Sequence, residues 1–135
     1  MRPRRNSLFA AATIALTCFL LTCSSCQGWV MDYGEPAAQF EATDAAAAAR
    51  DYLRQKVSVR GVVVSVDTAA LPRCVVELEG GVTAVFRGGQ VHDDWCRVGE
   101  VAYLDGIVAR AAPGEVVLQP AVGRDPMASF DPARR

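Results

Sequence analysis

From Val57 onward, apolar and polar residues alternate with a period of two, and this alternation constrains the fold more than any other feature of the chain. A period of two is typical of β-strands, in which successive side chains point to opposite faces. In the first predicted strand, Val57 to Val66, Val57 and Val59 share one phase, and Val62, Val64 and Val66 share the other. We therefore expect a glycine bulge at Gly61, which would keep both halves facing the core and bend the strand sharply.

The next two predicted strands, Cys74–Glu79 and Val82–Arg87, are separated by Gly80 and Gly81. A three-residue turn with a glycine in the left-handed conformation places the apolar residues of both strands on one face and Glu77 on the other. This register predicts the pairs Leu78 with Val82, Val76 with Ala84, and Cys74 with Phe86.

Residues 88–99 are expected to be irregular or briefly helical. A fourth strand, Val101–Ala111, and a fifth, Val116–Pro120, follow and are joined by a Pro113-Gly114 turn. Before the first strand, Ala45–Lys56 is rich in helix-forming residues and follows Thr43-Asp44, a pair suited to capping a helix. A low-complexity alanine linker is the alternative for this segment. The expected organisation is a leader over residues 1–26, a flexible tether over 27–42, a domain over 43–123 and a disordered tail over 124–135.

Five short strands after a helix predict an all-β, five-stranded barrel of the OB-fold type, although an SH3-like barrel or a small sandwich could carry the same pattern. Short motifs also resemble the successive strands of the tRNA_anti-like OB-fold family. They are Val59-Arg-Gly-Val-Val, Val82-x-Ala84-x-Phe86, Gly99-Glu-Val101, Asp105-Gly-Ile-Val and Val117-Leu118. The resemblance covers Thr43 to Gly123 and implies a small exported or lipid-anchored bacterial protein. Members often carry cysteines in the third strand and after the fifth, where this chain has Ala84 and Pro120. The family name does not imply tRNA binding.

The N-terminal leader combines three arginines with a 14-residue apolar run from Leu8 to Leu21. This arrangement predicts an export signal, because the run is shorter than the roughly 18 residues that a membrane-spanning helix needs. The cysteines that follow resemble a lipoprotein processing site. Cys26, preceded by two serines, is the favoured lipidation residue, and Cys23 is the alternative. An ordinary cleaved signal, a retained transmembrane helix and twin-arginine export are the other interpretations.

Lipidation at Cys26 would leave Cys74 and Cys96 as an even pair in an oxidising compartment. We therefore predict a disulfide between them that ties the segment after the third strand to the barrel. The alternative is two buried free thiols. A catalytic or redox pair has less support, because the chain lacks a Cys-x-x-Cys motif.

The charge of the chain without its leader argues against a nucleic-acid partner. Three of the 14 basic residues lie in the leader and all 15 acidic residues follow it, so 11 basic side chains face 15 acidic ones, a net charge of −4. Nucleic-acid binding depends on cationic contacts to phosphates. The barrel aromatics Phe86, Trp95 and Tyr103 do not suggest a stacking platform.

No motif in the sequence predicts catalysis, and we expect no cofactor. The segment His92-Asp93-Asp94-x-Cys96 contains metal-ligand types, but a tetrahedral site needs four ligands, so a solvated loop is favoured. The sequence thus predicts an exported, lipid-anchored, non-enzymatic OB-fold module in the cell envelope, on its periplasmic side or at the cell surface. Its partner would be an unknown envelope protein or a small ligand. A single-stranded nucleic-acid-binding protein is the alternative, and an enzyme or thiol-redox protein is a third hypothesis.

Overall fold

The computed structural model describes residues 34–69, 73–87 and 96–133. These residues belong to one compact unit, Tyr33–Arg135. The predictions made for the leader, for Cys23 and Cys26 and for the start of the tether lie outside the described residues. Among the described residues, the hydrophobic core extends from Ala38 to Ala121, so we expect residues 33–135 to fold on their own.

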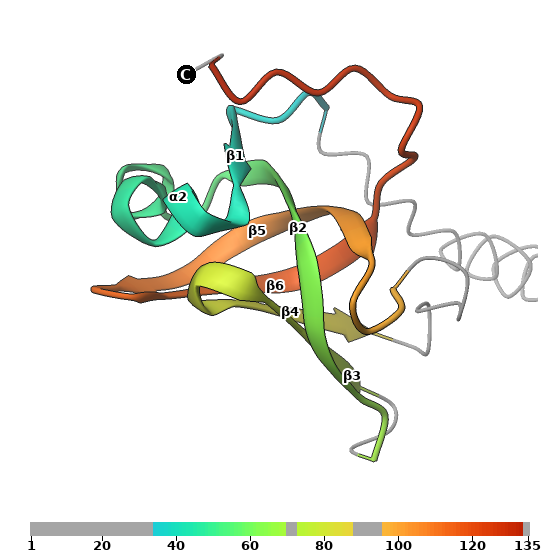
Figure 1. The fold of residues 1–135 in the computed structure, drawn as a ribbon. Helices are drawn as coiled ribbons and strands as arrows, with labels where there is room; N and C mark the ends of the chain where they lie inside the picture. Colours follow the sequence, from blue (N-terminus) through green and yellow to red (C-terminus); the bar gives the residue numbers. More distant parts are fainter. Residues whose placement is uncertain (1–33, 70–72, 88–95, 134–135) are drawn as a thin grey trace, which may run out of the picture. The chain divides into compact units, whose positions relative to one another are not determined.

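Five strands close into a mixed β-barrel (Figure 1). They are β2 (Lys56–Asp67), β3 (Arg73–Leu78), β4 (Val82–Arg87), β5 (Val101–Ala112) and β6 (Glu115–Gly123). The strands follow the order β2-β3-β4-β6-β5, and β5 closes the barrel by pairing with β2. The β4–β6 pair is parallel, and the other barrel pairs are antiparallel. The predicted five-stranded OB-fold barrel is confirmed.

The hairpin of β3 and β4 has the predicted register. Its apolar pairs face the core, and the turn is made by glycines in the left-handed region, with φ of 76° at Gly80 and 83° at Gly81. The paired residues are Leu78 with Val82, Val76 with Ala84, and Cys74 with Phe86. Polarity alone was sufficient to choose this register, because shifting it by one residue would turn Glu77 into the core.

The predicted bulge at Gly61 is wrong. Gly61 pairs regularly with Ala102 of β5, and the register shift lies further along, between Val63 and Ser65. Gly61 is needed for another reason: a Cβ on it would lie 2.4 Å from Cβ of Ala42. Because the register shift comes after Gly61 and not at it, Val63 is buried, whereas Val64, which was expected in the core, is 56% exposed.

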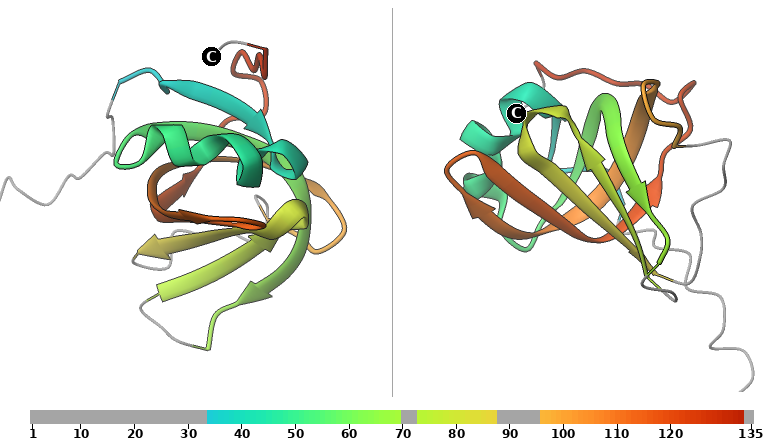
Figure 2. Two further views of the ribbon diagram at one scale, coloured as in Figure 1. Left: turned by 90° about the vertical axis from the view of Figure 1, so that its left-hand side faces the viewer. Right: turned by 60° about the horizontal axis from the view of Figure 1, so that its bottom comes forward.

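The helix before the barrel is shorter than predicted. It consists of α2 (Ala42–Ala48), continued by a 3₁₀ turn, η2 (Ala49–Tyr52). Thr43 and Asp44 lie inside its first turn, and the N-cap residue, Glu41, makes no side-chain capping bond. The helix lies against the barrel (Figure 2), and three of the alanines in this segment are buried. Small side chains on both surfaces let the helix approach β2 closely.

Two segments expected to be flexible or disordered pack against the barrel. Within the predicted tether, β1 (Ala38–Glu41) runs parallel to the start of β2, and its Phe40 is buried against the ring of Tyr52. Residues 124–133, here called the C-terminal strap, were expected to be part of a disordered tail. Instead they pass alongside β1 (Figure 1), and the Asp131 amide donates to Gln39 Oε1 at 2.7 Å. These contacts join residues far apart in the chain, so local composition could not reveal them.

Candidate interaction surface

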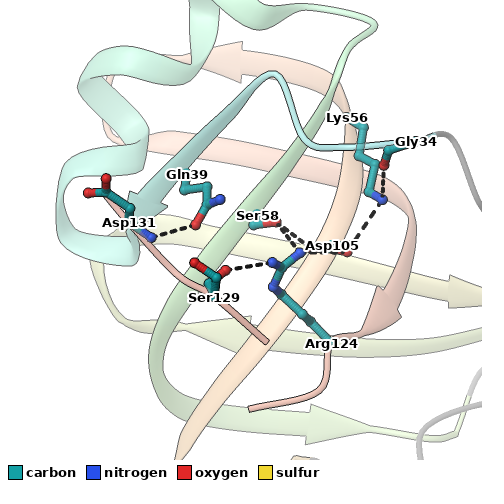
Figure 3. A network of polar contacts seen from close by, with 8 residues as sticks. All are labelled: Gly34, Gln39, Lys56, Ser58, Asp105, Arg124, Ser129 and Asp131. Atoms are coloured by element: carbon teal, nitrogen blue, oxygen red, sulfur yellow. Dashed lines mark hydrogen bonds and ion pairs between the residues drawn. The ribbon is translucent and has the colours of Figure 1, made fainter. Parts of the chain in front are cut away.

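A polar network fixes both ends of the domain to the outer face of β2 and β5 (Figure 3). We call Lys56, Ser58, Asp105 and Arg124 the polar clamp. Ser58 and Asp105 are register partners, and the Ser58 hydroxyl donates to the Asp105 carboxylate. The same carboxylate pairs with Arg124 Nη1 at 3.2 Å and with Lys56 Nζ at 3.5 Å. Because two cations pair with one largely buried carboxylate, we interpret the network as stabilising the fold.

The cations of the polar clamp also hold the backbone at each end of the domain. Lys56 Nζ donates to the Gly34 carbonyl at 2.6 Å, and Arg124 Nη2 donates to the Ser129 carbonyl at 2.8 Å. Gly34 lies at the N-terminal boundary of the described domain, and Ser129 belongs to the C-terminal strap. The polar clamp therefore fastens the end of the tether and the strap to the barrel.

Aromatic and charged contacts hold the rest of the strap. The Phe130 ring meets Tyr103 edge-on at 5.6 Å, and the Arg60 guanidinium lies 4.7 Å from the Phe130 centroid. Arg60 also donates to both carboxylate oxygens of Glu41, which raises the pKa of the guanidinium above its ordinary value. These contacts occupy the outer face of β5 and the first half of β2.

Four valines that are exposed or half-buried lie on the second half of β2, at the start of β5 and in the turn before β5. We call Val62, Val64, Val98 and Val101 the valine patch. Val62 is the register partner of Val101. The turn that carries Val98 is bonded to β2, because the Gly99 amide donates to the Val63 carbonyl at 2.8 Å and the Val63 amide donates to the Glu100 carbonyl at 2.9 Å.

The patch holds much of the exposed apolar surface of the domain. Of the five large apolar side chains that are exposed among the described residues, three belong to it: Val64 (56%), Val98 (65%) and Val101 (55%). The sequence did not reveal this surface, because Val62 and Val64 were expected to face the core. The register shift at Val64 places them differently.

Acidic side chains border the valine patch. Glu79 Oε1 accepts a long hydrogen bond from the Val62 amide at 3.4 Å, and Glu77 Oε2 accepts one from the Ser65 hydroxyl at 2.9 Å. Glu100 is exposed in the turn that carries Val98, as is Arg97. An apolar centre with a polar rim is the usual composition of a protein interaction surface.

Two arginines lie opposite each other at one end of the outer face of β3 and β4. Arg73 and Arg87 are register partners, both exposed, and neither has a hydrogen-bond or ion-pair partner among the residues that the structure describes. Like charges directly opposite on neighbouring strands destabilise a sheet modestly. This pairing could not be predicted from the sequence alone, because it depends on the register of the two strands.

Cys74 and Cys96 are both buried and close enough to interact electrostatically. Burial, and then the neighbouring Cys74 thiol, raise the pKa of Cys96 to about 11; burial, followed by Asp67, raises that of Cys74. The structure has both as free thiols, so the disulfide stays a prediction.

The segment with His92, Asp93 and Asp94, for which a solvated loop was favoured over a metal site, lies outside the described residues. Among residues 34–69, 73–87 and 96–133, no three His, Cys, Asp or Glu side chains gather as metal ligands. No helix in these ranges has the length and apolarity needed to cross a bilayer.

Among known proteins, the chain is similar to a solved structure of low sequence identity. No protein-family model matches the chain, and no curated protein matches it. The solved structure is a "putative nucleic acid-binding lipoprotein" from Klebsiella pneumoniae, with 22% identity and a TM-score of 0.38 over 61% of this chain and 80% of the other. A likeness at this level says nothing of what the present chain binds.

Proposed function

We propose that this protein is an exported, lipid-anchored OB-fold module without catalytic activity, and that it binds another envelope protein through the valine patch. The observation that carries the proposal is the exposure of Val64, Val98 and Val101 on segments that pair with one another, since Val62 pairs with Val101 and the turn after Val98 bonds to Val63. Contiguous exposed apolar surface on a small domain is typical of a docking site, whereas scattered apolar residues are not.

The leader supports the cellular part of the proposal. An export signal that ends at Cys26 would attach the chain to a membrane through lipid on that cysteine. Residues 27–37 separate Cys26 from β1. Eleven residues span at most about 40 Å, so the partner would lie near the membrane surface.

Site-specific photo-crosslinking in intact cells tests the proposal. A photoreactive amino acid replaces Val64, and the matched control replaces Met127, which is 90% exposed but lies on the strap. We expect a discrete protein adduct from position 64 only, and we expect Val101→Asp to abolish it without lowering the melting temperature. Adducts of equal yield from both positions would contradict the proposal.

Single-stranded nucleic-acid binding is a second candidate, favoured by the opposed Arg73 and Arg87. The strands that carry them correspond to the face that binds oligonucleotides in many OB-folds. This function predicts retention of residues 33–135 on single-stranded DNA at low salt. In the double variant Arg73→Gln, Arg87→Gln, the negative slope of log K against log salt would become shallower by about 1.4. Absence of retention at low salt would exclude this candidate.

A further inference from the structure

A groove of about 570 Å³ lies between the helical segment α2–η2 and the tip of the β5–β6 hairpin. One wall is formed by Thr43, Ala46, Ala47 and Arg50, and the other by residues 111–114. The hairpin tip lies beside α2 in both Figure 1 and Figure 2. The volume falls within the range typical of small-molecule sites.

The helical wall is a single stripe. Its members are spaced at i, i+3, i+4 and i+7, the spacing of one helix face. The opposite face holds the buried Ala42, Ala45 and Ala49, so packing against the barrel explains those alanines. Ala46 is partly buried and also packs against the core. Packing does not explain Ala47, which lines the groove at an exposed position where charged residues are usual.

The hairpin wall matches the helical wall in chemistry. It consists of Ala111, Ala112, Pro113 and Gly114. Small side chains and a proline ring therefore line most of both walls, and Arg50 is the one long side chain among the eight lining residues.

Arg50 is the one charged residue among those that line the groove. It has no hydrogen-bond or ion-pair partner among the described residues. On the hairpin, by contrast, Arg110 pairs with Glu115 at 2.6 Å. Asp44 and Asp51 belong to the same helical segment but do not line the groove. The groove thus combines apolar walls with one uncompensated positive charge.

We propose that this groove binds an apolar molecule with a single anionic group, such as an alkyl carboxylate, whose head pairs with Arg50 and whose chain lies along the alanine stripe. From residue 43 to residue 50 the stripe rises about 10 Å, which is close to the length of a decanoate chain. No residue of the groove belongs to the valine patch, so this proposal does not depend on the proposed function.

The test is titration of residues 33–135 with decanoate, kept below its micelle concentration and followed by amide chemical shifts. We expect saturable shifts at residues 43–50 and 111–114. Decanol and a decyl trimethylammonium salt, which lack the anionic group, should bind more weakly. The proposal would be overturned if decanoate shifted only amides outside these segments, or if the cationic amphiphile bound with the same affinity as decanoate.

Variants separate the charge from the apolar walls. Arg50→Gln should raise the Kd for decanoate about 3-fold, as expected for a solvent-exposed ion pair. Arg87→Gln, which removes another exposed arginine without a described partner, should leave the Kd unchanged. Ala47→Leu keeps a helix-forming residue and should weaken binding by filling the groove. Equal Kd values for Arg50→Gln and Arg87→Gln, or unchanged binding by Ala47→Leu, would contradict the assignment.

Discussion

At the scale of single residues, two glycines of the barrel, Gly61 and Gly80, allow the helix to approach it closely because they have no side chain. A Cβ on Gly61 would lie 2.4 Å from the Ala42 side chain, and a Cβ on Gly80 would lie 2.6 Å from the Ala42 carbonyl oxygen. Ala42 therefore touches both β2 and the β3–β4 turn. Gly80 has a second constraint, since its φ of 76° is strained for other residues.

Adding one methyl group at Gly61 should destabilise the domain. We expect Gly61→Ala to lower the free energy of unfolding by about 1–3 kcal/mol, because it overpacks a fixed contact. Urea denaturation of residues 33–135 measures the change. The double variant Gly61→Ala, Ala42→Gly removes the clash from the other side and should recover part of the loss. A double variant less stable than the sum of the two single changes would show that the contact with Ala42 is not the cause.

The buried thiol of Cys96 predicts a pH dependence of stability in the reduced protein. Its pKa rises from 9.0 to about 11 on folding, so between these pH values the unfolded chain loses a proton that the folded domain keeps. The unfolded state then binds fewer protons, and stability falls as pH rises. Urea denaturation from pH 8 to 11 should show a steeper loss for the reduced parent than for Cys96→Ala. Parallel curves would contradict the raised pKa.

At the scale of elements, the C-terminal strap is held by contacts that differ in strength. The pairing of Arg124 with Asp105 is largely buried, with side chains 14% and 13% exposed, whereas the contacts of Phe130 lie nearer the surface. Removing one partner of a buried ion pair leaves a charge uncompensated. Phe130 is therefore the better residue for testing the strap without disturbing the barrel.

Truncating Phe130 should loosen the strap. We expect Phe130→Ala to cost about 1 kcal/mol, since it removes an edge-on ring contact and a cation–π contact. Met127→Ala changes a strap residue that is 90% exposed and should have no measurable effect. Hydrogen exchange adds a local measurement: the Asp131 amide, bonded to Gln39, should exchange faster in Phe130→Ala only. Equal exchange in the two variants would mean that Phe130 does not hold the strap.

The elements differ in how far the sequence could predict them. The β3–β4 register followed from polarity, because only one alignment keeps Glu77 outside. The phase of β2 did not follow, because valines on both sides of Gly61 could face the core, and the register shift at Val64 depends on partners in two other strands. The strap and β1 are too short and polar to show a period. The groove combines two segments about 60 residues apart, and the valine patch required the correct β2 phase.

At the scale of the whole molecule, the polar clamp gathers the two ends of the domain on one side of the barrel. Lys56 bonds to Gly34, and Arg124 bonds to Ser129, while both pair with Asp105. The valine patch lies further along β2, past Gly61. If the chain is lipid-anchored through the segment before Gly34, a pull on the tether is transmitted to the start of β2 and not to the patch. A tethered binding module benefits from this separation, because the docking surface is independent of its attachment.

Export and lipidation predict a specific covalent state of the whole chain. We expect intact-mass spectrometry of the membrane-extracted protein to show a chain that begins at Cys26, carries acyl groups and is two hydrogens lighter than its reduced form, as a Cys74–Cys96 disulfide requires. Closing a loop of this size would add about 3 kcal/mol of stability in the entropic model. The variant Cys74→Ser, Cys96→Ser should therefore have a lower melting temperature than the parent, and the difference should be larger for the oxidised parent than for the reduced parent. A mature chain that starts at another residue and carries no lipid would contradict the proposed lipid anchor. Full alkylation of both cysteines after denaturation without reductant would show that the thiols stay free in the envelope, as they are in the structure.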